Sequence, residues 1–565
     1  MSAGIEMHPP ASASLLTRAK ERLARIKEKP NPIWARELQQ SIRRGHTPAA
    51  LMLVTGGSAL LVTAVGGSLG VFRSPASIGA IIYQTFFSLA FFVVLLLGPA
   101  LAANAIVAER EGRTWEAVLL TGMSPAEIAR GKFLSALTAI GLYIVALAPV
   151  GAVSFLFGGV TASDVVMAFA YLFVFAALSV SFGLAVSSKM QRLGTAIVTT
   201  LLLAVAIAFT SFGTLGFGLS FGANELWPRI PQGSPVWLPV AYERATFGLD
   251  YLYFLFLLPI VGFGIPAWFF YEATIANLAS ASDDRSSGLK RWFLVSSAAL
   301  AITLAILPFR TPSSPLETTL VGISVFTAFM GFSAFVFLGE PLGPSRRVRA
   351  DWERNGSSAF VRFMGPGLIK TFQLVLLVGV LGLGCLTVTG ALSIATGIST
   401  TDDYQKLALF TVHLASFFLF VAGFSAWMRA RAGGLSGARI TTVIVVFAAF
   451  IVPWLLAATA GAFTDYGEDA LVIAAPSPFY VAVVLDAVGR TSVLCKIVAS
   501  LVASAIWAVL GILAFFAGSA RARQAIAAHE ALLAETDRLL EAEDRAQAEA
   551  AGMTSPGESV EPSAP

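Results

Sequence analysis

The chain has 565 residues, of which 56% are hydrophobic and 13% are charged, and its formal net charge is +4. Soluble globular domains carry about 25% charged residues, so this composition excludes an ordinary soluble domain. The two cysteines, Cys385 and Cys495, lie in or beside apolar stretches and argue against a disulfide framework or a metal site.

Apolar segments recur along the whole chain, and a helix needs about 20 such residues to cross the hydrocarbon core of a bilayer. We expect twelve spans, at 50–72, 78–108, 132–158, 163–187, 195–222, 249–275, 292–308, 316–338, 371–396, 407–428, 440–463 and 493–518. The predicted fold class is therefore an all-α polytopic membrane protein.

The distribution of basic residues predicts the orientation. If the N-terminus is cytosolic, 31 of the 38 Lys and Arg residues lie in inner segments and 7 in outer ones. Positively charged loops remain in the cytosol, so we expect a plasma (inner) membrane protein with both termini cytosolic. This also accounts for the basic charge, and we expect no nucleic-acid partner.

Residues 1–30 are predicted to be a cytosolic segment, and residues 31–45 an amphipathic helix. Asn31 can cap this helix and Pro32 suits its first position. Trp34, Leu38 and Ile42 recur every four residues along one face. A helix of this kind lies in the plane of the membrane.

The loop between the second and third spans, residues 109–131, has the pattern of two helices with a break. Thr114 can cap a short helix, Gly122 suits its end, and Ser124 with Glu127 forms a capping box before the third span. The short helix has apolar side chains on more than one face, so we expect it to dock on something besides lipid. A helix lying among the lipid headgroups is the alternative.

Both segments resemble ABC-2-type transporter permeases, which are type V-like ABC exporters. In the loop the resemblance rests on Glu109, Arg110, Gly112, Thr114, Glu116, Leu119, Leu120, Ser124, Glu127, Ile128, Gly131 and Lys132, with Arg113 interrupting the pattern. In the preceding helix it rests on the pairs Asn31-Pro32 and Arg36-Glu37 and on Leu38, with Trp34 and Arg43 beside them. The resemblance implies that residues 31–45 are the family's elbow helix.

The same resemblance implies that the loop is a coupling helix that docks on a separate ATPase subunit, with Trp115 and Val118 among the coupling residues. This chain would then be a transport subunit without catalytic or metal-binding residues, and export is the family's direction. The sequence has no GxxxxGK[ST] phosphate-binding loop. We therefore expect ATP and Mg²⁺ to bind to the partner, in two copies, and no cofactor in this chain.

The order of spans and loops repeats, which predicts a first half at 50–275, a cytosolic linker at 276–291 and a divergent second half at 292–518. The inner loop 339–370 has the position but not the pattern of the first loop, with Asp351–Arg354 as its only trace. Two outer segments share a phrase, GSPVWLPVAYE and PSPFYVAVVLD. The resemblance implies that they turn back toward the membrane at Ser234, Pro235 and Trp237 and at Ser477, Pro478 and Phe479. One chain could form a pseudo-dimer, or two chains could pair as a homodimer.

Charged residues are scarce within the spans, which does not favour an ion pathway. The acids Asp164, Glu272 and Glu317 fall at span ends, and the internal polar residues Asn104, Gln373 and His413 are expected to be hydrogen-bonded packing residues. With 43 Phe and 50 Gly in the chain, an amphipathic or lipid-like substrate is our hypothesis.

After the last span we expect a solvated, charged helix at 519–550 and a disordered tail at 551–565. Two other functions remain open. Residues 109–113 imitate the acid-Arg-x-Gly-Arg loop of secondary transporters of the major facilitator type, although the leading glycine and a buried acid are missing. A membrane scaffold without transport activity is the second alternative.

Overall fold

The computed structural model describes residues 31–43, 46–69, 75–226, 248–249, 252–311, 314–396, 400–432, 434–463, 469–488 and 494–550. These residues form helices and turns, with no β-strand among them. Twelve of the helical segments are long and apolar enough to cross a membrane. The predicted all-α polytopic architecture and the number of spans are confirmed.

The chain forms two compact units, Met1–Ile306 and Leu307–Pro565. The boundary between the units lies inside the seventh span, α11 (Ser287–Arg310). The cause is local packing: Trp292 Nε1 donates a hydrogen bond to the Ile265 carbonyl at 2.9 Å, and the Tyr253 hydroxyl donates to the Thr303 carbonyl at 2.7 Å. The seventh span therefore packs with the first six.

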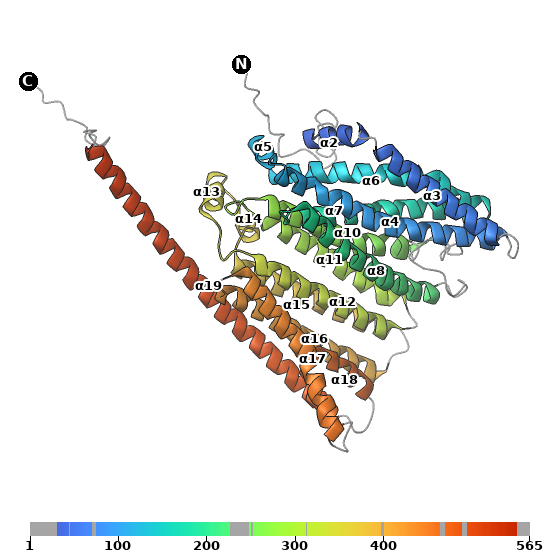
Figure 1. Cartoon of the computed structure of the whole chain (residues 1–565). Coiled ribbons are helices and arrows are strands. Elements are labelled where there is room, and N and C mark those ends of the chain that lie inside the picture. Colours follow the sequence, from blue (N-terminus) through green and yellow to red (C-terminus); the bar gives the residue numbers. More distant parts are fainter. Residues whose placement is uncertain are drawn as a thin grey trace, which may run out of the picture. The chain divides into compact units, whose positions relative to one another are not determined.

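The first unit is a bundle whose helices run alongside one another (Figure 1). Its other elements are α2 (Pro32–Arg43), α3 (His46–Leu69), α4 (Pro75–Glu111), α5 (Trp115–Leu120), α6 (Pro125–Leu156), α7 (Ala162–Ser187), α8 (Leu193–Leu226), the π-helix η2 (Leu252–Leu257) and α10 (Leu258–Leu278).

Helix α4 is the centre of the first unit and packs most closely on α7. A Cβ atom placed at Gly183 would lie 2.7 Å from Pro99 Cα, so only glycine allows this approach of the two helices. Nearby, the Ser187 hydroxyl donates to the Ala103 carbonyl at 2.7 Å. The rings of Phe91 and Phe175 meet edge to face between the same helices. Small residues and aromatic rings thus hold α4 against α7. The loop helix α5 follows α4 in the chain.

The second unit contains the five remaining spans and several short helices. They are α12 (Pro315–Val336), η3 (Phe337–Gly339), α13 (Arg346–Arg354), α14 (Ala359–Met364), α15 (Leu368–Ala395), α16 (Thr401–Arg431), α17 (Leu435–Phe463), η4 (Asp469–Ala474), η5 (Pro478–Tyr480), α18 (Val481–Ala487) and α19 (Leu494–Ala550). The most extensive helix pair in this unit is α16 with α19.

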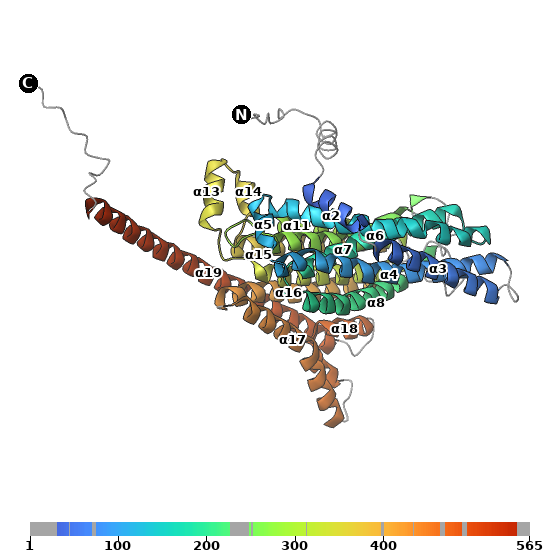
Figure 2. The ribbon, with the colours of Figure 1, turned by 45° about the horizontal axis from the view of Figure 1, so that its top comes forward.

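The last span and the predicted charged helix form one continuous helix of 57 residues, α19. It runs well past the ends of α16 and α17 (Figures 1 and 2). We expected its extension to be solvated, but the extension forms ion pairs with another helix. Arg346 pairs with Asp537 at 2.6 Å, and Arg349 pairs with Glu530 at 2.5 Å. These exposed ion pairs join α19 to the loop helix α13. The predicted tail 551–565 and the segment 1–30 lie outside the described residues.

Candidate functional site

The loop between α4 and α6 folds as a helix, a break and a second helix. At the break Gly122 has a φ of +72°, a conformation suited to glycine, and Ser124 forms the predicted capping box with Glu127. The predicted Thr114 cap is not formed. The Thr114 hydroxyl donates instead to the Glu109 carbonyl at 3.3 Å, because the inserted Arg113 adopts a φ of +56° and turns the chain back on α4.

Helix α5 has an inward and an outward face. Val118 on the inward face is buried against Ile33 of α2 and Ile128 of α6, with Trp115 half-buried beside them. On the outward face Leu119 is 48% exposed and Leu120 is 87% exposed. The predicted coupling residues therefore divide into two groups. Trp115 and Val118 anchor the helix, whereas Leu119, Leu120 and Glu116 are exposed.

Helix α2 packs against the start of α6, where its cap residue Asn31 meets Gly131. Asn31 Oδ1 accepts from the backbone N–H of Ile33 at 3.0 Å, and Asn31 Nδ2 donates to the Glu127 carbonyl at 2.9 Å. A Cβ atom at Gly131 would lie 2.5 Å from Asn31 Oδ1, so glycine is needed for this approach. Trp34 Nε1 also donates to Thr138 at 3.2 Å. The helix is thus bound to the bundle as well as amphipathic.

Four charged residues from three helices meet behind α5, and we refer to them as the charge cluster: Arg36, Glu37, Glu109 and Lys132. Lys132 is 1% exposed and pairs with Glu37 and, at 2.8 Å, with Glu109. Arg36 pairs with Glu109 at 2.9 Å from a half-exposed position. Two cations thus balance two carboxylates, which is the condition for burying such charges. The cluster fastens α2, α4 and α6 together.

These contacts change the interpretation of three predicted site residues. Lys132 and Glu109, predicted as coupling residues, and Glu37, predicted as an elbow-helix residue, are largely buried, so they are not on the exposed face of α5. Leu38 is half-buried on α2. Arg43 ends the same helix, and its side chain lies outside the described residues.

Arg110 links the loop to another inner connection. Its guanidinium lies over the Trp115 ring, 5.4 Å from the ring centroid. Its Nη1 donates to the carbonyls of Ser188 and Met190, at 2.8 and 3.3 Å. Gly112 donates its N–H to the Ala108 carbonyl at 2.9 Å as α4 ends. The loop is therefore tied to the connection between α7 and α8.

The loop 339–370, which we expect to be an inner loop, also contains two short helices, although it lacks the sequence pattern of the first loop. Ser345 caps α13 and Ser358 caps α14 through their side chains. Phe360 and Val361 on α14 are exposed. The remnant Asp351–Arg354 is the end of α13, the helix whose arginines pair with α19. This loop thus shares the layout of the first loop.

Of the two predicted outer segments, Ser234, Pro235 and Trp237 lie outside the described residues. The other turns into the second unit. The Ser477 hydroxyl donates to the Phe450 carbonyl at 2.9 Å and accepts from Trp454 Nε1 at 3.0 Å. Pro478 is buried, and Phe479 is 60% exposed with its ring 4.8 Å from that of Phe450.

His413 on α16 is hydrogen-bonded to the segment that contains Ser477. Its Nε2 lies 3.1 Å from the Ser477 carbonyl, which requires Nε2–H as the donor, and Ser500 approaches Nδ1 at 3.1 Å. His413 lies twelve residues into α16, about 18 Å along the helix axis. Three residues after Ser477, burial and the nearby Cys495 raise the pKa of Tyr480 to about 12, so its hydroxyl remains protonated.

Replacing His413 by leucine should lower the free energy of unfolding by about 1–3 kcal/mol, because the Ser477 carbonyl and the Ser500 hydroxyl each lose a partner in a buried site. The thermal unfolding midpoint of the purified protein measures the change. Asn104→Leu is the control, since Asn104 is an exposed polar residue of α4. Equal midpoints for the two variants would contradict the role of His413.

The other polar and acidic residues of the spans have simpler environments. Gln373 and Asn104 are both exposed. The expectation that they are internal packing residues is therefore wrong. Asp164 forms a capping box with Thr161 at the start of α7, as a residue at a span end can. Within the described ranges, no group of three or more His, Cys, Asp or Glu residues could hold a metal ion.

The fold and this site define an integral membrane protein of two helical units, with a short loop helix buttressed by a buried charge cluster. No family model matches the chain, and no curated protein matches it.

Proposed function

We propose that this protein is the permease subunit of an ATP-binding cassette exporter, driven by a separate ATPase that docks on α5. The main support for this proposal is the outward face of α5. Leu119 and Leu120 are exposed at the end of a loop whose other face is fixed to the bundle. Exposed leucines on a braced helix are the kind of surface that a protein partner covers.

The charge cluster suggests how a movement of α5 would reach the spans. Helix α5 connects α4 to α6, and the cluster holds the ends of these helices to α2. A force on α5 would therefore move three helices as one body. Arg110 would carry the same movement to the connection between α7 and α8.

ATP and Mg²⁺ would bind in the partner, since the sequence has no phosphate-binding loop. The helical layout of loop 339–370 favours a second docking point and hence a pseudo-dimer of the two units, with both termini cytosolic in the inner membrane. The aromatic and glycine-rich spans favour an amphipathic substrate.

Replacing Leu120 by aspartate should weaken ATPase binding by about 2 kcal/mol, roughly thirtyfold, because a charge would replace an apolar contact at the centre of the interface. Folding should be unaffected, since this side chain is 87% exposed. Candidate stand-alone ATPases from the same genome are co-expressed with this chain, and their affinity and ATPase activity are measured.

Leu539→Asp on α19 is the matched control, because this leucine is 62% exposed on another cytosolic-side helix and should not matter. Phe360→Asp on α14 asks separately whether the second loop also binds. If Leu120→Asp and Leu539→Asp bind the ATPase equally well, α5 is not the docking helix.

A further inference from the structure

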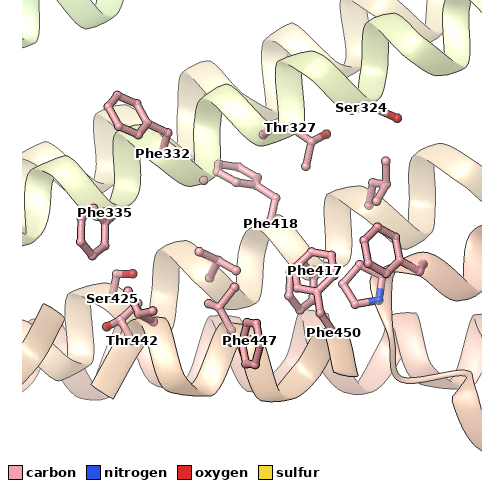
Figure 3. A pocket seen from close by; sticks show the side chains of 18 of the residues that line it. Ser324, Thr327, Phe332, Phe335, Phe417, Phe418, Ser425, Thr442, Phe447 and Phe450 are labelled. Atoms are coloured by element: carbon pink, nitrogen blue, oxygen red, sulfur yellow. The ribbon is translucent and has the colours of Figure 1, made fainter. Parts of the chain in front are cut away.

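The second unit contains a groove that the proposed function does not use. It has a volume of about 780 Å³ and is lined by α12, α16, α17, η5 and the first residue of α18. Eight of its 21 lining residues are phenylalanines, and Figure 3 shows Phe332, Phe417, Phe418, Phe447 and Phe450 among them. A groove of this size falls within the range of ligand sites. Its walls suit an apolar chain.

Among the described residues that line the groove, one hydroxyl group lacks a partner. Ser324, Thr327 and Thr442 each donate to a carbonyl of their own helix, at 2.8, 2.7 and 2.8 Å. Ser425 is fully buried, and its hydroxyl has no hydrogen-bond partner among the described residues. A buried, unsatisfied hydroxyl is costly unless a ligand or water completes it. Figure 3 shows Ser425 beside Thr442, at the end of the groove where Phe335 lies.

The same end of the groove is positively charged. Arg439 lies one turn before Thr442 on α17, and its guanidinium is 5.8 Å from the centroid of the Phe335 ring. Its Nε is buried, again without a hydrogen-bond partner in the part of the chain that the structure describes. Arg429, one turn after Ser425, donates its Nε–H to the Glu340 carbonyl at 3.1 Å.

The neighbouring acid, Glu340, lies against Arg429, so the charge left for a ligand is that of Arg439. The Glu340 carboxylate accepts from the Gly367 N–H at 3.0 Å and from the Thr371 hydroxyl at 3.2 Å, both on the α15 side. Arg431 lies over the Trp427 ring. An apolar groove with a cationic, hydrogen-bond-donating end matches a molecule with an anionic head and an apolar tail.

We propose that the groove holds one acyl chain of an anionic phospholipid from the surrounding bilayer, with the headgroup at Arg439 and Ser425. Thr442 and Ile451 line it nine residues apart on α17, a rise of about 14 Å. This is close to half of a hydrocarbon core of about 30 Å, which is the depth of one leaflet. With the predicted orientation that leaflet is the cytosolic one, where anionic lipids attract arginine. This inference does not depend on the proposed ATPase coupling.

The acyl chain is tested with the full-length protein in nanodiscs that contain phosphatidylglycerol with a photoactivatable group on its chain. Labelling should map to the groove peptides of α12, α16 and α17. Gly331→Leu should abolish it, because Gly331 lines the groove and a Cβ there meets nothing within 4 Å. The control is Gly384→Leu on α15, where the Cβ also meets nothing within 4 Å but the residue does not line this groove, and labelling should persist.

The headgroup is tested with the same probe built on zwitterionic phosphatidylcholine. Arg439→Gln should lower the preference for phosphatidylglycerol about fivefold, the effect of one basic residue at a membrane surface. Ser425→Ala, a smaller change, should weaken labelling by both lipids. Undiminished groove labelling in Gly331→Leu, or equal labelling of the wild type by the two lipids, would overturn the proposal.

Discussion

Replacing Lys132 by methionine should destabilise the protein by about 3–5 kcal/mol, the usual cost of removing one partner from a buried ion pair. Lys132 is 1% exposed and is shared by Glu37 and Glu109. Without the ammonium group, two carboxylates would face each other at the junction of α2, α4 and α6. One oxygen of Glu109 is already buried without a hydrogen-bond partner among the described residues, so it has no reserve of hydrogen bonds.

The thermal unfolding midpoint in detergent measures this loss, and Arg36→Gln is the matched control. Arg36 also contacts Glu109, at 2.9 Å, but it is half-exposed, and its removal should cost less than about 1 kcal/mol. Combining Lys132→Met with Glu37→Gln and Glu109→Gln should restore most of the stability, because no buried charge would then remain unpaired. If Lys132→Met and Arg36→Gln have the same midpoint, the cluster does not hold the helices together.

The same variant separates docking from transmission in the proposed transporter. Lys132→Met leaves Leu119 and Leu120 on the exposed face of α5. ATPase binding should therefore persist while ATP-driven transport falls. Loss of both together would indicate that α5 itself had unfolded.

The spans and helix caps could be predicted because their signals are local in the sequence. Twenty apolar residues identify a span whatever surrounds it, and Ser124 caps a residue three positions away. Thr114 shows where local reasoning stops. Its hydroxyl oxygen could accept from a backbone N–H of α5, or the hydroxyl could donate to the Glu109 carbonyl, and the backbone turn at Arg113 favours the second.

The pairing of residues far apart in the chain could not be predicted. The resemblance included Glu37 in one segment and Glu109 and Lys132 in another, but not as partners, since Glu37 and Lys132 are 95 positions apart in the chain. Ser425 and Arg439 carried no signal, because a serine and an arginine near span ends are common. Their significance depends on which neighbours satisfy them, and this is a property of the packed unit.

The packing of α16 on α19 depends on glycine, and Gly511→Ala should cost about 3 kcal/mol or more, at the upper end of the range for overpacking. A Cβ atom at Gly511 would lie 2.5 Å from the carbonyl carbon of Leu419 and 2.6 Å from the N of Phe420. Both are backbone atoms, which cannot rotate away as a side chain can. The two helices would have to separate.

Gly384→Ala is the matched control and should change stability in the opposite direction. Its Cβ meets nothing within 4 Å, so only the higher helix propensity of alanine remains, worth up to about 1 kcal/mol. Separation of α16 from α19 would also pull Ser500 from His413, so Gly511→Ala combined with His413→Leu should cost less than the sum of the two changes. Unfolding midpoints of the three variants measure this, and a stabilised Gly511→Ala would show that the helices do not meet at this glycine.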